Sequence, residues 1–389
     1  MRRLITLVPV SVFMLVAACG GGSSDLSTST TPPTSGSNVA TITVNSGPSQ
    51  NSVNTGFVTV TVCAPGSTTN CQTVDNIEVD TGSYGLRLVS SALASTFTLP
   101  PETDADGNQI LECTVFADGV SWGPVDTADI QISGETASSV PVQVIGDPNF
   151  SAVPAACSSR GTPDDTVAMF GANGILGVGP YVQDDGFYFT CPSGTCGETQ
   201  PTLAQEVANP VASFAADNNG VIIELPGIAA GGAVTVTGAL IFGIGTQSNN
   251  GLGSATIYTL DPNYGTLTIT YNGTAFSSSY LDSGSNANFF VDSSIPTCSG
   301  FFCPTGTLSL TATITGVNGA TNTVPFTVAN ATTLFDNNPS GTAFDSLAAP
   351  EGDSDTFDFG LPFFYGVTAV YTAISNASTP GGTGPYVAF

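Results

Sequence analysis

Two tetrapeptides, Asp80-Thr81-Gly82-Ser83 and Asp282-Ser283-Gly284-Ser285, are the most informative part of this sequence. Each follows an apolar strand end and precedes another apolar segment. At this composition, the pattern Asp-Ser/Thr-Gly-Ser/Thr arises by chance roughly 0.1 to 0.2 times per chain, so one copy alone would be weak evidence. Two copies, one in each half of the chain, predict two similar loops that each carry one carboxylate.

The residue types in these loops suit acid–base chemistry. Two carboxylates held about 3 Å apart cannot both ionise, so they share a proton, and one acts as base while the other acts as acid. Glycine lets backbones approach closely, and hydroxyl groups can hydrogen-bond the carboxylates and orient them. The positions expected to support the pair in this way are Thr81, Gly82, Ser83, Ser283, Gly284 and Ser285. The alternative is two unrelated Asx turns at strand ends.

The charge balance excludes most other enzyme classes. The 389 residues include 30 Asp and Glu, 4 Lys and Arg and no His, and all four basic residues are arginines. The chain therefore lacks the imidazole base of serine and cysteine hydrolases, the lysines of P-loop and Schiff-base enzymes, and the histidines of most zinc sites. Nucleic acid is excluded as a partner because almost no cation could neutralise its phosphates. We expect no cofactor and no metal.

The first 38 residues predict export and attachment to a membrane. Residues 1–18 have the charged start and short apolar stretch of a signal peptide, too short to span a bilayer. They end in Val16-Ala17-Ala18-Cys19, which resembles a bacterial lipobox and implies lipidation of Cys19. In lipoproteins that resemble this one, a glycine such as Gly20 favours the outer membrane of the cell envelope. Residues 19–38 are expected to be a flexible tether.

Eight cysteines remain after Cys19, an even number in an exported chain. Their spacing favours three small disulfide loops and leaves one pair by elimination, although sequence alone does not strictly define connectivity. The expected pairs are Cys63–Cys71, Cys191–Cys196, Cys298–Cys303 and Cys113–Cys157. A catalytic thiol is disfavoured because no histidine or lysine could lower its pKa.

From about residue 39 the chain consists of short alternating runs rich in Thr, Val and Ile, separated by Gly, Pro, Asn and Asp. Such runs are strand and turn signals, so we expect an all-β protein. Its length exceeds one ordinary domain. We predict an N-terminal β lobe over residues 39–216 and a C-terminal β lobe over residues 217–389. The clearest helix signal is Thr202–Asn209, which begins with a capping box.

The chain resembles the pepsin-like aspartic peptidases at more than the two Asp loops. In that family a hydrophobic-hydrophobic-Gly segment crosses beneath each loop, and Ile175-Leu176-Gly177 and the more divergent Asp358-Phe359-Gly360 are similar to it. Phe116–Gly123 resembles the glycine-containing hairpin, or flap, that covers the substrate; its expected flap residues are Phe116, Gly119, Trp122 and Gly123. The resemblance implies a bilobal fold of two β-barrel-like lobes, with a cleft between them and Asp80 and Asp282 as catalytic residues.

Some positions depart from the family pattern. Phe116 stands where the family usually has a tyrosine, and Trp122 either supplies an indole N–H near the carboxylates or is an exposed aromatic at the hairpin tip. Arg87 replaces a common tryptophan; it either lowers the pKa values of the dyad or forms a salt bridge with a surface acid. Leu361 stands where an aspartate is common.

These observations support a monomeric aspartic endopeptidase that cleaves an extended polypeptide with an Asp dyad and an activated water. One alternative is a catalytically silent protein of the same fold that binds peptides or acts as an envelope scaffold. Another is a β-sandwich adhesin in which the two Asp motifs are coincidental turns.

Overall fold

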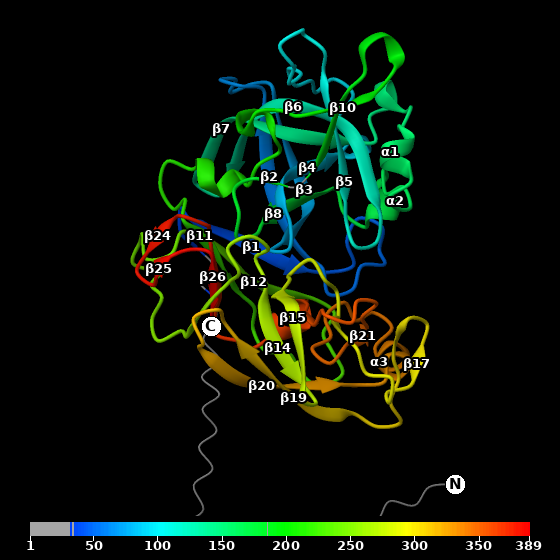
Figure 1. The fold of residues 1–389 in the computed structure, drawn as a ribbon, viewed down its shortest axis with the longest axis vertical. Coiled ribbons are helices and arrows are strands. Elements are labelled where there is room, and N and C mark those ends of the chain that lie inside the picture. The colour runs from blue at the N-terminus through cyan, green and yellow to red at the C-terminus, as the bar shows by residue number, and fades with distance from the viewer. Residues whose placement is uncertain (1–31, 33–34, 185) are drawn as a thin grey trace, which may run out of the picture.

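The computed structural model describes residue 32, residues 35–184 and residues 186–389. The predicted signal peptide, Cys19 and most of the predicted tether lie outside these residues, so those expectations stay predictions. Within the described part, no helix is long and apolar enough to cross a membrane. Figure 1 shows two β lobes stacked along the long axis, with β2 to β8 (residues 56–178) in one, β14, β15, β19 and β20 (residues 267–328) in the other, and β11 (Gly220–Glu224) and β26 (Tyr386–Ala388) between them.

Six strands close into a barrel in the N-terminal lobe. They follow one another in the order β6, β7, β4, β8, β3 and β2, and an additional β6–β2 pairing completes the ring. Their apolar side chains alternate inward, as Val58, Val60 and Val62 do in β2, and fill the interior. The strands are β2 (Gly56–Cys63), β3 (Cys71–Asp80), β4 (Tyr84–Val89), β6 (Val120–Ile132), β7 (Glu135–Ile145) and β8 (Gly174–Val178).

A second sheet region joins the two lobes. β1 (Val39–Val44) pairs with β2 on one side and with β12 (Val236–Phe242) on the other. The sheet continues through β11, β23, β26 and β13, so strands that follow the predicted boundary at residue 217 extend the sheet of the first lobe. These strands are β11 (Gly220–Glu224), β13 (Ile257–Thr259), β23 (Val370–Ala373) and β26 (Tyr386–Ala388).

The C-terminal lobe is a seven-stranded sheet that curves around an aromatic core. Phe290 stacks on Phe357 with ring centroids 5.0 Å apart, and Phe326 packs edge-on against both rings. The sheet order is β20 (Thr321–Val328), β19 (Leu308–Thr315), β14 (Leu267–Tyr271), β15 (Thr274–Leu281), β22 (Asp358–Phe359), β16 (Asn288–Phe290) and β21 (Ala348–Pro350).

The remaining elements are short. Strands β5 (Ile110–Val115), β9 (Phe187–Thr190) and β10 (Gly197–Thr199) continue the first sheet beyond β6. Two small hairpins are β17 (Thr297–Cys298) with β18 (Phe301–Phe302) and β24 (Ser378–Thr379) with β25 (Gly382–Thr383). The helices are α1 (Ala155–Ser158), α2 (Val167–Phe170), α3 (Ala331–Asn337) and α4 (Leu361–Phe364). Single 3₁₀ turns are η1 (Ser90–Ala92), η2 (Pro148–Phe150), η3 (Pro192–Gly194), η4 (Leu203–Gln205) and η5 (Pro210–Ser213).

The predicted helix over Thr202–Asn209 is wrong in length. The capping box forms, but the helical geometry ends after the single 3₁₀ turn at Leu203–Gln205. Tertiary partners then take the backbone donors that a helix would use, since the hydroxyl of Tyr188 accepts from the Val207 N–H. The helix propensity of the segment is therefore overridden by its tertiary contacts.

The fold and the disulfides agree with the sequence. The described residues form an all-β, bilobal structure, and the four expected cysteine pairs are all bonded. The β-sandwich alternative is wrong, because one lobe closes into a barrel instead of stacking two flat sheets.

Candidate active site

Asp80 is the last residue of β3, and the strand that crosses beside it sets its position. β8 runs parallel to β3, with Asp80 opposite Gly177, and antiparallel to β4, with Gly85 opposite the same glycine. A Cβ on Gly177 would lie 2.4 Å from the backbone nitrogen of Tyr84, so only glycine allows the loop to close over this strand. The segment Ile175-Leu176-Gly177 therefore lies where the resemblance implies.

The second lobe repeats this arrangement around Asp282. β15 runs parallel to β22, with Leu281 opposite Phe359, and the Asp282 N–H donates to the Phe359 carbonyl at 2.9 Å. A Cβ on Gly360 would lie 2.1 Å from the Ala287 carbonyl oxygen, so the close approach again requires glycine. The divergent segment Asp358-Phe359-Gly360 thus crosses the second Asp loop as expected.

The two loops bring their carboxylates together. Asp80 and Asp282 line the same two cavities between the lobes, and the negative charge of Asp282 acts on the Asp80 carboxyl. Each carboxylate also accepts a backbone N–H from the glycine of its own loop, at 2.7 Å for Gly82 and 2.8 Å for Gly284. A Cβ on Gly82 would lie 2.8 Å from the Asp282 Cγ, and one on Gly284 would lie 2.7 Å from the Asp80 Oδ1, so these glycines make room for the opposite carboxylate.

Thr81 and Ser283 join the two loops through a reciprocal set of buried hydrogen bonds. The Thr81 hydroxyl donates to the Leu281 carbonyl at 3.1 Å and accepts the Ser283 N–H at 2.9 Å. The Ser283 hydroxyl donates to the Val79 carbonyl at 2.7 Å and accepts the Thr81 N–H at 3.1 Å. Sequence reasoning expected these hydroxyls to orient the carboxylates, whereas they bind backbone groups across the lobes. The sequence signal for this network was that a hydroxyl residue directly follows each Asp, Thr81 in the first loop and Ser283 in the second.

The other two hydroxyls are not equivalent. Ser285 donates to Asp282 Oδ2 at 2.9 Å, as the sequence predicted. Ser83 lies beside Asp80 and lowers the pKa of that carboxyl, but its buried Oγ has no hydrogen-bond partner among the described residues.

The surroundings of Asp80 favour its protonated form. Burial is the largest cause that raises its pKa well above the usual value, and the negative charge of Asp282 adds to it. Ser83 and the Gly82 N–H act in the opposite direction. Asp80 therefore keeps a proton at pH values where an exposed aspartate is ionised.

The predicted flap is the hairpin of β5 and β6, whose turn is closed by a 2.8 Å bond from the Phe116 N–H to the Gly119 carbonyl. Phe116 and Ala117 line both cavities that adjoin the dyad, so the hairpin tip lies above the carboxylates. Phe116 also packs edge-on against Phe170, with ring centroids 5.8 Å apart. Gly123 lies lower in the hairpin, where a Cβ would meet the Val144 carbonyl oxygen.

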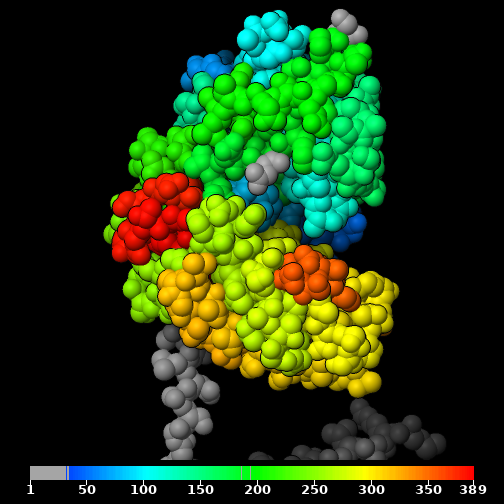
Figure 2. Space-filling view, viewed as in Figure 1, coloured from blue at the N-terminus to red at the C-terminus, as the bar shows by residue number. Residues whose placement is uncertain are grey.

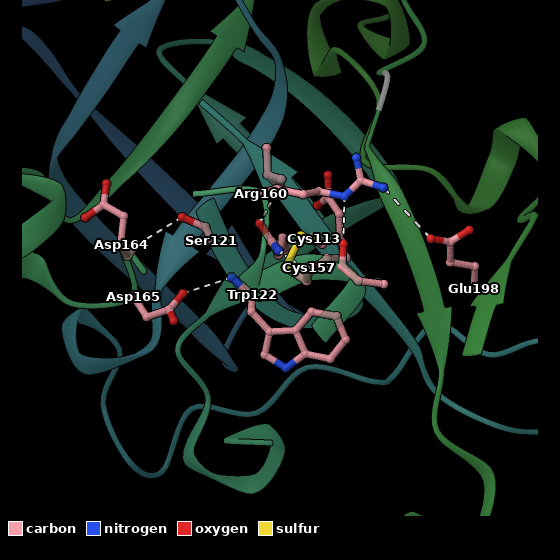
Figure 3. Close-up of a disulfide and its surroundings, with 12 residues drawn as sticks. Cys113, Ser121, Trp122, Cys157, Arg160, Asp164, Asp165 and Glu198 are labelled. Atoms are coloured by element: carbon pink, nitrogen blue, oxygen red, sulfur yellow. Dashed lines mark hydrogen bonds and ion pairs between the residues drawn. A yellow bond between two sulfur atoms is a disulfide. The ribbon is translucent and has the colours of Figure 1, made fainter. Parts of the chain in front are cut away.

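Both sequence interpretations of Trp122 are wrong. The side chain is 3% exposed, and it packs against Phe189 and the Cys113–Cys157 disulfide in a small separate core (Figure 3). Its indole N–H donates to the Phe150 carbonyl at 2.8 Å. It lines neither cavity at the dyad. The register of the hairpin explains this, because Trp122 lies opposite Cys113, two residue pairs away from the Val115–Val120 pair that ends the hairpin ladder.

Arg87 forms a salt bridge, as one sequence interpretation expected, but its partners are buried. Its guanidinium lies 2.5 Å from Glu112 Oε1 and 2.9 Å from Asp184 Oδ2, and its side chain is 1% exposed. Arg87 also bonds Thr114 and the Tyr84 carbonyl. Burial raises the pKa of Glu112 to about 8, against the opposing effect of Arg87. The positive charge is thus shared between two carboxylates that are not those of the dyad.

The dyad lies at the base of a cleft with two cavities. The smaller one is about 420 Å³ and includes Arg87 and Tyr264 in its lining; the larger is about 840 Å³ and includes Glu78 and Asp358. Both are lined by Asp80, Asp282 and residues of both lobes. Figure 2 shows the surface hollowed between the lobes. Sequence reasoning did not assign Glu78 or Asp358 to the site, because isolated acids in a chain with 30 of them give no signal.

Metal binding receives no support from the geometry. Among the described residues, no group of three or more His, Cys, Asp or Glu side chains could hold a metal ion.

Comparison with known proteins gives one family and a distant structural likeness. The model of a family described as "Protein of unknown function (DUF3443)" matches residues 34–389. No curated protein matches the sequence significantly. Among solved structures, the chain is similar to an aspartic proteinase from Irpex lacteus, with a TM-score of 0.49 and 15% sequence identity over 90% of this chain and 96% of that one.

Proposed function

We propose that this chain, which belongs to the DUF3443 family, is an aspartic endopeptidase that hydrolyses peptide bonds with Asp80, Asp282 and a water molecule. The observation that carries the proposal is the pair of adjoining carboxylates, one from each lobe, whose loops make room for each other and which line the same cleft. Such a pair holds one proton between two groups and so supplies an acid and a base at once.

Asp80 is the acid and Asp282 the base in the first step. Asp80 holds the proton, for the reasons given above, and Asp282 accepts hydrogen bonds from Gly284 and Ser285. Asp282 takes a proton from the water as its oxygen attacks the peptide carbonyl carbon, and Asp80 gives its proton to the carbonyl oxygen. In the second step Asp282 protonates the nitrogen, the C–N bond breaks, and Asp80 recovers a proton from a hydroxyl of the intermediate.

The substrate is an extended polypeptide. Both cavities are open and are lined from above by the hairpin tip, so a strand-like segment can lie across the dyad beneath Phe116. Backbone hydrogen bonds then give affinity, and the cavities receive alternate side chains. In this proposal the protein acts as a monomer, and a lipid on Cys19 anchors it to the cell envelope at the outer membrane.

The test is cleavage of a denatured protein by the purified full chain between pH 3 and 6, with and without pepstatin. Asp80→Asn and Asp282→Asn should each lower kcat/KM by about 100-fold or more, because each removes one partner of the acid–base pair. Asp355→Asn is the matched control, since Asp355 is an exposed carboxylate in the lobe of Asp282 and lines neither cavity. Equal cleavage by wild type and Asp80→Asn would overturn the proposal.

A catalytically silent peptide-binding or scaffold protein is the second candidate. It is favoured by Phe116, which lines both cavities without the hydroxyl group that a tyrosine would offer, and by Leu361, which packs in the core next to Gly360. Binding of peptides in the cleft without any cleavage by the wild-type chain would support this candidate.

A further inference from the structure

The larger cavity beside the dyad is lined by carboxylates from both lobes. In addition to Asp80 and Asp282, its lining contains five acidic residues and no arginine or lysine. We call this set the acidic subsite; its members are Glu78, Asp118, Asp164, Glu351 and Asp358. The smaller cavity differs, because its acid Asp184 is paired with Arg87.

Two members of the acidic subsite lie beside the two catalytic loops, Glu78 on the strand that leads into its loop and Asp358 on the strand that crosses beside the other. Glu78 lies two residues before Asp80 on β3, so both side chains point to the same face of the strand. In the second lobe, Asp358 lies directly opposite Tyr280, the residue two before Asp282. Each lobe thus contributes one carboxylate next to its catalytic loop, and these two carboxylates face the same cavity.

Asp358 is a buried carboxylate with an unused acceptor. The residue is 2% exposed, and its Oδ1 has no hydrogen-bond partner among the described residues. Asp164 repeats this feature, with 8% exposure and an Oδ1 without a partner. Figure 3 shows Asp164 beside Asp165, whose carboxylate instead accepts the Trp122 N–H. Buried polar atoms without partners are rare and costly, so these oxygens point to a missing donor.

The described residues place no cation beside these oxygens. Of the two arginines in the described residues, Arg87 is held by Glu112 and Asp184. Arg160 lies over the Phe187 ring, 3.9 Å from Glu198. Burial is the largest cause that raises the pKa of Glu78, and the negative charges of the neighbouring acids come second, with no positive charge to offset them. A cation placed among these carboxylates would favour their charged forms.

We propose that the acidic subsite binds the side chain of a lysine or arginine next to the scissile bond and so directs cleavage to basic sequences. This inference rests on the proposed peptidase function. Ammonium and guanidinium groups offer several N–H donors and no acceptor, which matches a wall of carboxylate oxygens. Their long aliphatic stems reach from an extended backbone past Phe116 and Phe170 into the cavity.

The composition of the chain agrees with this specificity. It contains no lysine, and its described arginines are the buried Arg87 and the partly exposed Arg160. An enzyme that cleaves next to basic residues therefore meets almost no site in its own folded or unfolded chain.

The experiment compares matched peptides that differ at one residue beside the cleaved bond. The residue is arginine, lysine, the uncharged lysine analogue norleucine, or glutamate. The purified full chain should cleave the arginine and lysine peptides with kcat/KM about 10-fold to 100-fold above the norleucine peptide, the range for a hydrogen bond to a charged partner. The glutamate peptide should be the slowest of the four.

Variants of the acidic subsite test where this preference arises. Glu78→Gln keeps the size of the side chain and should reduce the ratio of arginine to norleucine cleavage about 10-fold. Asp118→Asn changes an exposed residue at the hairpin tip, is compatible with folding, and should reduce the ratio by a smaller factor. Asp355→Asn, outside the subsite, should leave the ratio and the cleavage rates at wild-type values.

Failure of this inference is distinguishable from failure of the peptidase proposal. Cleavage without preference for basic peptides, or a preference that survives both subsite substitutions, would overturn the acidic subsite and leave the peptidase intact. Fluorescence anisotropy of labelled forms of the same peptides gives the second readout. Absence of cleavage, with arginine peptides binding more tightly than norleucine peptides only when Glu78 is present, would support the subsite and overturn the peptidase. Absence of both cleavage and selective binding would overturn both.

Discussion

Replacement of Ser283 by alanine should destabilise the protein by separating the two Asp loops. Its hydroxyl is buried, accepts the Thr81 N–H at 3.1 Å and donates to the Val79 carbonyl at 2.7 Å. Thr81 is 5% exposed, so water cannot easily replace the lost partner. Each buried group left without a partner costs about 1–3 kcal/mol, and two of them together should lower the free energy of unfolding by about 2–6 kcal/mol.

A matched serine in the same loop serves as the control. The Ser285 hydroxyl donates to the Asp282 carboxylate and the residue is partly exposed, so water can take its place in Ser285→Ala. That variant should lose about 1 kcal/mol or less. Thr81→Ser, which keeps a hydroxyl at the facing position, should likewise stay close to wild type.

The assay is urea unfolding of the oxidised protein, followed by tryptophan fluorescence and far-UV circular dichroism. The free energy of unfolding is compared between the variants at one pH value. A Ser283→Ala protein within about 0.5 kcal/mol of wild type, the range of ordinary surface substitutions, would refute the reasoning that this network joins the lobes.

Two other predictions concern residues away from the dyad. Burial raises the pKa of Asp126 to about 7, so its contribution to stability is full below the ordinary aspartate pKa and is lost as pH rises toward 7. Asp126→Asn should therefore flatten the fall in the free energy of unfolding between pH 4 and 7, measured by urea titrations. An unchanged slope would contradict this. Trp122→Phe should cost about 1–2 kcal/mol because the Phe150 carbonyl loses its donor, yet leave kcat/KM for peptides unchanged; a tenfold loss of cleavage in a folded variant would place Trp122 in the flap after all.

The sequence predicted the features that depend on local pattern. Alternating Thr, Val and Ile runs identified the strands, because the side-chain period of a strand is visible in the chain itself. Close cysteine spacing identified three disulfide pairs, and the even count supplied the fourth. The repeated Asp motif and the resemblance of Ile175-Leu176-Gly177 and Asp358-Phe359-Gly360 identified which segments meet at the loops.

The sequence was less informative where a side chain chooses between distant partners. Trp122 lies only six residues from Phe116, yet it turns into a separate core that segments around Phe150 and Phe189 complete. Thr202–Asn209 begins like a helix, but Tyr188 takes the Val207 N–H after a single turn. Such outcomes depend on which chain segment arrives nearby, and no local pattern encodes that.

The shortage of cations shows both what the sequence determines and what the tertiary structure adds. By itself, the sequence indicated that carboxylates are the residues best able to carry a reaction in this chain, because it offers no histidine, no lysine and few arginines. Only the tertiary structure decided where those few cations and many acids meet. Arg87 lies with Glu112 and Asp184, whereas the cavity that Glu78 and Asp358 line beside the dyad has no cation among its described lining residues. The composition determines which charged groups the chain has. Their pKa values and their pairing depend on burial and distance, which are set only when segments some 200 residues apart come into contact, as Thr81 and Ser283 do.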